Sequence, residues 1–128
     1  MKISEKEIEK ILSCGSFLIK AGYKEIHDNC SIAYSNNMLN FKIAFEPYDD
    51  IINVNIIFRE NNEVFDVGWI AFVRENIQAN SNDKLNDAII LLQYIDEHYS
   101  DITNYEFCKD SEKLIDDFIE KQKSKLVK

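Results

Sequence analysis

An alternating pattern of apolar side chains between Leu39 and Val73 is the feature that most constrains the fold of this 128-residue chain. Apolar residues recur at every second position in three successive runs, and many of them are β-branched or aromatic. Because successive side chains of a strand point to opposite faces, each run predicts a strand with one buried face. The three inward series are Leu39, Phe41, Ile43 and Phe45, then Ile52, Val54, Ile56 and Phe58, then Phe65, Val67, Trp69, Ala71 and Val73.

Two four-residue loops, residues 47–50 and 60–63, separate these runs and are rich in turn-forming residues. Loops at these positions pair Phe45 with Ile52 and Phe58 with Phe65. All three apolar series then lie on the same face, and a one-residue slip would place one of them on the other face. The pattern therefore predicts two consecutive hairpins.

An earlier run, residues 30–35, extends this sheet by one strand. Asn36 and Asn37 can form a two-residue hairpin because asparagine tolerates positive φ. Such a turn pairs Ser35 with Met38 and places Tyr34 opposite Leu39. The sequence thus predicts a four-stranded antiparallel meander with strands in sequential order.

Helices are predicted on both sides of the sheet in the sequence. Ser4 and Glu7 have capping-box spacing, which predicts an N-terminal helix from Ser4 to about Ala21. A second helix is expected from about Asp83 to His98, and a third is expected to begin at Asp110. Residues 23–29 and 101–109 are predicted connectors. We expect a single α+β domain, residues 1–128, with an N-terminal helix, a four-stranded antiparallel meander sheet and two C-terminal helices.

Charge is distributed unevenly along the chain, whose net charge is −8. Residues 46–110 hold fourteen acidic and four basic side chains, whereas each flanking segment has a balance of +1. Such a field repels nucleic acid and acidic membrane surfaces and favours a basic partner. Solubility alone is the alternative explanation.

Targeting signals and chemical motifs do not identify an activity. The N-terminal segment is charged, no apolar run reaches the length of a membrane span, and the three cysteines are an odd number. These features predict a cytoplasmic protein. His27 and Cys30 have no second close pair of soft ligands, and no phosphate-binding loop or nucleophile motif is present. We therefore expect no catalytic residue, no metal site and no cofactor.

The order of elements resembles that of the small acidic immunity proteins of bacterial polymorphic toxin systems. The segments that carry the resemblance are LNFKIAFEPYDDIINVNIIF, EVFDVGWIAFV and FCKDSEKLI, after an N-terminal helix. The resemblance implies a non-enzymatic cytoplasmic protein that binds and blocks a cognate toxin, often a basic nuclease. It assigns no role to an individual residue.

The outward face of the predicted sheet is the candidate surface for binding a protein. The predicted registers place apolar side chains there, rimmed by carboxylates and one tyrosine, unless the third helix covers them. Two alternatives stay open: a small-ligand site or enzyme pocket between sheet and helices, and a homo-oligomer formed through the sheet face. The candidate partner-binding residues are Glu46, Tyr48, Asp49, Asp50, Ile51, Asp66, Ile70 and Phe72.

Overall fold

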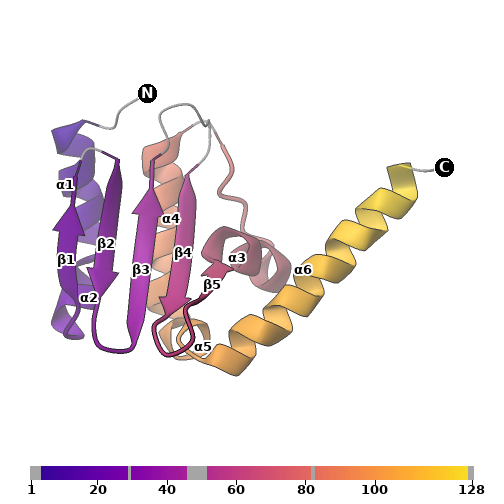
Figure 1. Ribbon diagram of the computed structural model, residues 1–128. Helices are drawn as coiled ribbons and strands as arrows, with labels where there is room; N and C mark the ends of the chain where they lie inside the picture. The colour runs from indigo at the N-terminus through magenta and orange to yellow at the C-terminus, as the bar shows by residue number, and fades with distance from the viewer. Residues whose placement is uncertain (1–3, 29, 46–51, 82, 127–128) are drawn as a thin grey trace.

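The computed structural model describes residues 4–28, 30–45, 52–81 and 83–126, and it confirms the α+β architecture. Within these residues, five antiparallel strands form one sheet in the order β1-β2-β3-β4-β5 (Figure 1). The strands are β1 (Lys24–His27), β2 (Ser31–Ser35), β3 (Leu39–Ala44), β4 (Asn53–Phe58) and β5 (Glu63–Asp66). The helices are α1 (Glu5–Cys14), α2 (Ser16–Lys20), α3 (Val67–Glu75), α4 (Lys84–Glu97), α5 (Tyr99–Ile102) and α6 (Tyr105–Leu126).

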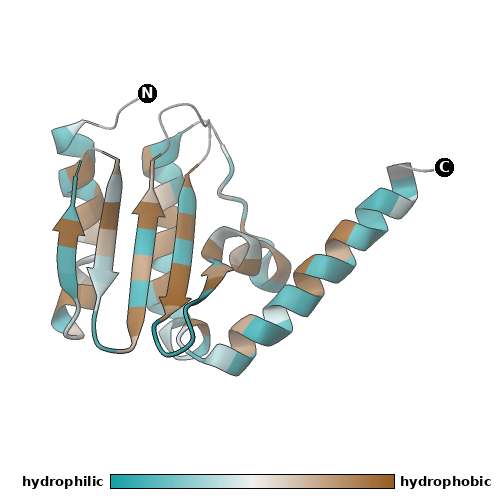
Figure 2. Ribbon diagram, viewed as in Figure 1, coloured by the Kyte–Doolittle hydropathy of each residue, from teal (hydrophilic) through white to brown (hydrophobic). Residues whose placement is uncertain are grey.

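The core lies between one face of the sheet and the helices α1 and α4, which run behind the strands in Figure 1. Side chains alternate along β2, β3 and β4, so that apolar and polar bands follow each other along β3 and β4 in Figure 2. The inward side chains are fully buried: Ile32, Tyr34, Phe41, Ile43, Val54 and Ile56. The predicted buried face of the central strands is thus confirmed.

The N-terminal helix begins as predicted but is divided in two. Glu7 Oε1 accepts the Ser4 N–H at 3.0 Å, and Ser4 Oγ accepts the Glu7 N–H at 3.2 Å, which completes the capping box. The helix breaks at Gly15, where the Tyr34 ring packs so closely that a Cβ would overlap its hydroxyl oxygen. The second part, α2, ends before Gly22, whose φ of 97° favours glycine.

The third apolar run was wrongly predicted to be a strand as far as Val73. Strand β5 ends at Asp66, and residues 67–75 form helix α3. Ile70 and Phe72 are apolar as well, so the run does not truly alternate, and short apolar runs do not distinguish strand from helix. Asp66 favours the helix and sets its first residue, because its carboxylate accepts the Trp69 N–H at 3.0 Å and caps the helix.

Two predicted connectors are regular structure. Lys24–His27 forms the edge strand β1, in which Ile26 pairs with Ala33 of β2. Helix α6 begins at Tyr105 rather than at Asp110. The Asn104 side chain accepts the Phe107 N–H at 3.2 Å, which stabilises the first turn at the earlier position.

The register between β3 and β4 is confirmed, since Ile43 pairs with Val54 and Phe41 with Ile56. The other two predicted registers are wrong by two residues. Tyr34 pairs with Phe41 rather than with Leu39, and Phe65 pairs with Ile56 rather than with Phe58. Each shift comes from a turn displaced by one residue. A two-residue shift keeps every side chain on its predicted face, because the side-chain period is two.

Asparagine residues determine where these two turns form. Asn36 Oδ1 accepts the N–H groups of Met38 and Leu39, both at 2.8 Å, which places Asn37 and Met38 at the tip of the first turn. In the second turn, Asn62 adopts a φ of 59°, a conformation that asparagine tolerates. The asparagine residues of the two turns therefore set the registers of β2 with β3 and of β4 with β5.

We predict that Gly15→Ala destabilises the protein, whereas Tyr34→Phe does not. The added methyl group of Gly15→Ala would collide with the Tyr34 ring, at a cost of about 1–3 kcal/mol that exceeds the gain in helix propensity. The Tyr34 hydroxyl is buried and has no hydrogen-bond partner among the described residues, so Tyr34→Phe is expected to be neutral or stabilising. Urea unfolding of both variants measures this, and a stabilising Gly15→Ala would contradict the packing.

Candidate functional site: an apolar cavity beside Trp69

The early end of strand β5 leaves a hollow beside β4. The last residue pair between these strands is Asn55 with Asp66, so residues 52–54 have no β5 residue opposite them. A cavity of about 410 Å³ lies here, between the start of β4, helix α3, residues 77–80 and Phe118 of α6. We call it the Trp69 cavity. Its volume falls within the range typical of sites for small ligands or for inserted side chains.

The walls of the Trp69 cavity are mostly apolar and come from β4, β5, α3, α4 and α6, together with Ile52 and residues 77–80. A few polar side chains also line it, and they could orient an occupant by hydrogen bonding. The main apolar contributors are Ile52, Val54, Trp69, Phe72, Leu91 and Phe118. The polar contributors are Asn53, Asp66, Gln78 and Asn80.

Three aromatic rings from α3 and α6 form one rim of the cavity. The ring centroid of Trp69 lies 6.0 Å from that of Phe72 and 6.0 Å from that of Phe118, and the Phe72 and Phe118 centroids are 5.0 Å apart. The rings meet edge to face or tilted, which is the favoured geometry for aromatic pairs. We call these three residues the aromatic cluster. Trp69 is 38% exposed, so the cluster is accessible from solvent.

Helix α6 reaches the cluster because Arg74 joins it to α3. The Arg74 guanidinium carbon lies 4.3 Å from the Phe107 ring centroid, and its Nε donates to Ser111 Oγ at 2.9 Å. Beyond this contact, α6 projects away from the sheet (Figure 1). Leu114, which is 39% exposed, lines a second and more open hollow on the other side of Phe72 and Phe118.

Asp66 places a carboxyl group with a shifted pKa at the edge of the Trp69 cavity. Burial raises the pKa of its carboxyl group, and the N–H groups of Trp69 and Gly68 partly oppose this by hydrogen bonding to the ionised form. Gly68 keeps this corner open, since a Cβ there would lie 3.2 Å from Asp66 Oδ1. The site thus offers a half-buried carboxylate at the edge of an apolar cavity.

The structure places the predicted partner-binding residues in three different situations. Five of them, residues 46 and 48–51, lie outside the described residues. Asp66 lines the cavity and Phe72 belongs to the aromatic cluster. Ile70 is completely buried. Ile70 and Phe72 therefore do not lie on an outward sheet face, because their segment is helical.

Sequence reasoning missed Phe118 and Leu91, which come from distant helices. It also assigned Trp69 to the core of a strand, whereas the indole lies on the cavity rim. The signal for the helix was present: Asp66 stands three residues before Trp69, at the spacing of an N-cap and its N–H partner. No such local signal brings α6 to the same place.

Comparisons with known proteins do not identify a family. No family model matches the chain, and neither the curated proteins nor the solved structures contain a significant match. Within the described ranges, no group of three or more metal-ligating side chains is assembled, and no helix is long and apolar enough to cross a membrane.

We predict that Asp66 and Asp28 titrate on opposite sides of 3.8, the ordinary aspartate pKa. Burial raises the pKa of Asp66, so this group reduces stability as pH rises from 3.8 through its folded pKa. The N–H groups of Cys30 and Ser31 lower the pKa of Asp28, which therefore adds stability above 3.8 that is lost as pH falls through its folded pKa. Carboxyl ¹³C NMR titration measures both values. An Asp66 midpoint below that of Asp28 would contradict the assignment.

Proposed function

We propose that this chain is a non-enzymatic binding protein that inhibits a basic protein toxin by docking to it through the aromatic cluster and the Trp69 cavity. The observation that carries the proposal is an exposed tryptophan on the rim of an apolar cavity. Tryptophan is enriched among the residues that dominate protein–protein binding energy, and apolar pockets receive the anchoring side chains of a partner. The resemblance to immunity proteins and the acidic balance of the chain support the same function.

The geometry of the cluster suits an anchor. Trp69 is held by ring contacts to Phe72 and Phe118, so that binding would cost little side-chain entropy. Leu114 extends the apolar surface along α6, towards the second hollow. A partner side chain that enters the Trp69 cavity would contact both the indole and the apolar walls. This arrangement supports binding by insertion rather than by a flat contact.

The charge of the described residues supports a basic partner. Residues 52–110 contain eleven acidic and four basic side chains, a balance of −7. The basic groups are engaged within the protein: Arg59 donates to the Asn36 carbonyl at 2.7 Å, Arg74 packs on Phe107, and Lys109 lies 3.6 Å from Glu63. Exposed carboxylates on α4 and α5 include Asp96, Glu97 and Asp101. This field would accelerate encounter with a cationic surface.

A second function, binding of a small apolar ligand, is favoured by the cavity itself. Its volume and its few polar side chains fit such a site. Asp66 would then accept a hydrogen bond from the ligand or pair with a cationic group on it. An uncharged apolar dye that fluoresces when bound at this site, and that Gly68→Ala excludes, would favour this function.

We predict that Trp69→Ala abolishes protection in cells that co-express a candidate toxin from a neighbouring gene, whereas Met38→Ala retains it. Truncating a binding anchor typically costs at least about 2 kcal/mol, or roughly 30-fold in affinity. Met38 is the matched control, since it is 74% exposed and lies in the β2–β3 turn. Survival is the measurement. Thermal unfolding of both variants must show a folded protein before survival is interpreted.

In vitro, the only tryptophan of the chain is also a direct probe of the interaction. Binding of the toxin should shift Trp69 fluorescence to shorter wavelength, because the indole loses contact with water. The association rate should fall as salt is added. A tight complex in which Trp69 emission is unchanged would place the interface elsewhere and reject the aromatic cluster.

A further inference from the structure

Strand β1 forms one edge of the sheet, and a second binding surface lies along it. Among the described residues, β1 has β2 on one side and no strand on the other (Figure 1). Ile26, at its centre, is 72% exposed and points to the face of the sheet opposite the core, because it pairs with Ala33 rather than with a buried residue. An exposed edge strand presents unpaired backbone groups to other chains.

The hydrogen bonding between β1 and β2 shows which backbone groups point outward. The Asp28 N–H donates to the Ser31 carbonyl at 2.9 Å, so Asp28 and Ser31 form a hydrogen-bonded pair. Such pairs alternate along an antiparallel ladder, which makes Ile26 with Ala33 the next one. The N–H and C=O groups of Glu25 and His27 therefore point away from β2, towards the open edge.

We propose that two copies of this protein associate through β1, as an antiparallel strand pair centred on Ile26. In this register, Glu25 faces the partner's His27 and His27 faces the partner's Glu25. All outward backbone groups of these two residues are then hydrogen-bonded across the interface, and the two sheets become continuous. The twofold axis passes between Ile26 and the partner's Ile26, which form a close pair that shields both side chains from water.

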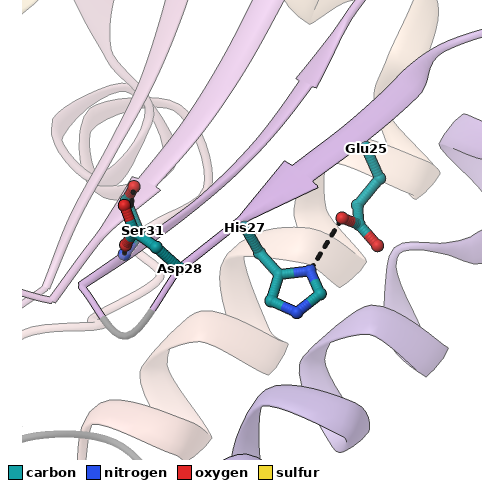
Figure 3. A network of polar contacts seen from close by, with 4 residues as sticks. All are labelled: Glu25, His27, Asp28 and Ser31. Carbon is teal, nitrogen blue, oxygen red and sulfur yellow. Dashed lines mark hydrogen bonds and ion pairs between the residues drawn. The ribbon is translucent and has the colours of Figure 1, made fainter.

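The charges of β1 are self-complementary in this register. Glu25 faces a histidine, and Lys24 faces the partner's Asp28. Within one chain, His27 Nδ1 and Glu25 Oε2 already lie 2.8 Å apart on the same side of the strand (Figure 3). Asp28 is held in the adjoining turn, where its Oδ1 accepts the N–H groups of Cys30 and Ser31 (Ser31 is shown in Figure 3). A carboxylate that faces a histidine ring or an ammonium group across a strand pair can accept a hydrogen bond from it, which stabilises the pair.

Neighbouring registers lack this complementarity. A two-residue shift in one direction places Glu25 opposite the partner's Glu25, and the same shift in the other direction places His27 opposite the partner's His27. One-residue shifts place the backbone groups of Glu25 and His27, which point to the open edge, opposite partner residues whose backbone groups point to their own β2. The Ile26-centred register is thus selected by both hydrogen bonding and charge. Because β1 spans only Lys24–His27, the association is expected to be weak.

Sedimentation velocity of the full chain, from about 10 μM to about 1 mM, tests the proposal. We expect a reversible monomer–dimer equilibrium. Ile26→Lys should abolish it, since two ammonium groups would meet at the axis. The matched control is Val64→Lys, because Val64 is also exposed and lies in β5 at the opposite edge of the sheet. Dimerisation of the Val64→Lys variant should be unchanged.

Exchanging the side chains' charges at positions 25 and 27 tests whether Glu25 and His27 pair across the twofold axis or whether a changed net charge alone weakens the dimer. Glu25→Lys should weaken the dimer by about tenfold, because the twofold axis repeats each altered pair. His27→Glu should weaken it similarly, and the double variant should recover most of the lost affinity. Circular dichroism establishes that each variant is folded.

Amide hydrogen exchange provides a readout specific to the register. The Glu25 and His27 amides should exchange more slowly at high protein concentration, whereas the Ile26 amide, already bonded to β2, should change little. A protein that is monomeric at about 1 mM overturns the proposal. So does a dimer that survives Ile26→Lys or is lost in Val64→Lys.

Discussion

The hydrogen bond from the Trp69 N–H to the Asp66 carboxylate is the interaction on which the candidate site depends. It ends β5 and starts α3 within one residue. Since β5 stops there, the first part of β4 has β3 on one side and no residue of β5 on the other, where the Trp69 cavity lies. The same helix turns the indole towards the cavity rim. The position of this capping carboxylate thus fixes where β5 ends and where α3 presents Trp69.

The site also requires a contact between elements that are distant in the sequence. Arg74 packs against Phe107 and donates to Ser111, which holds α6 against α3. Phe118 follows Ser111 by two helical turns and therefore meets Trp69 and Phe72. The position of Phe118 is set by the rigidity of α6 once its first turns are held. The second hollow, beyond Leu114, exists for the same reason.

The two edges of the sheet differ in how their strands are protected. At β5, Tyr105 of α6 donates to Glu63 at 2.6 Å and packs edge-on against Phe58 and Phe65. Strand β1, which has four residues as β5 does, is not covered in this way, and its charged sequence discourages pairing with unrelated strands. A charge pattern that discourages unrelated strands can still match its own copy, because an antiparallel pair brings each acidic residue opposite a basic one. Specific self-association and protection against aggregation are therefore compatible at β1.

Much of the sheet could be predicted from the sequence because its determinants are local. The alternation along β2, β3 and β4 depends on the two-residue period of a strand, and it gave the correct buried face even where the registers were displaced. The Ser4 capping box and helix α4 were also predicted correctly, since caps and apolar periodicity act within a few residues. The displaced registers came from asparagine turn chemistry, in which several positions compete with small differences in energy.

The tertiary structure decided the state of the apolar run after Asp66 and the assembly of the cavity. Residues 67–73 are apolar at nearly every position, so their pattern fits either a strand or a helix. As a strand they would extend the sheet, whereas as a helix they bury Ile70 and Ala71 and present Trp69 to α6. Which state wins depends on the partners available from α4 and α6. The sequence by itself determined the three strands β2, β3 and β4 and their buried face through local periodicity, and the tertiary structure alone placed Leu91 and Phe118 beside Trp69, because contacts between distant helices leave no periodic signal.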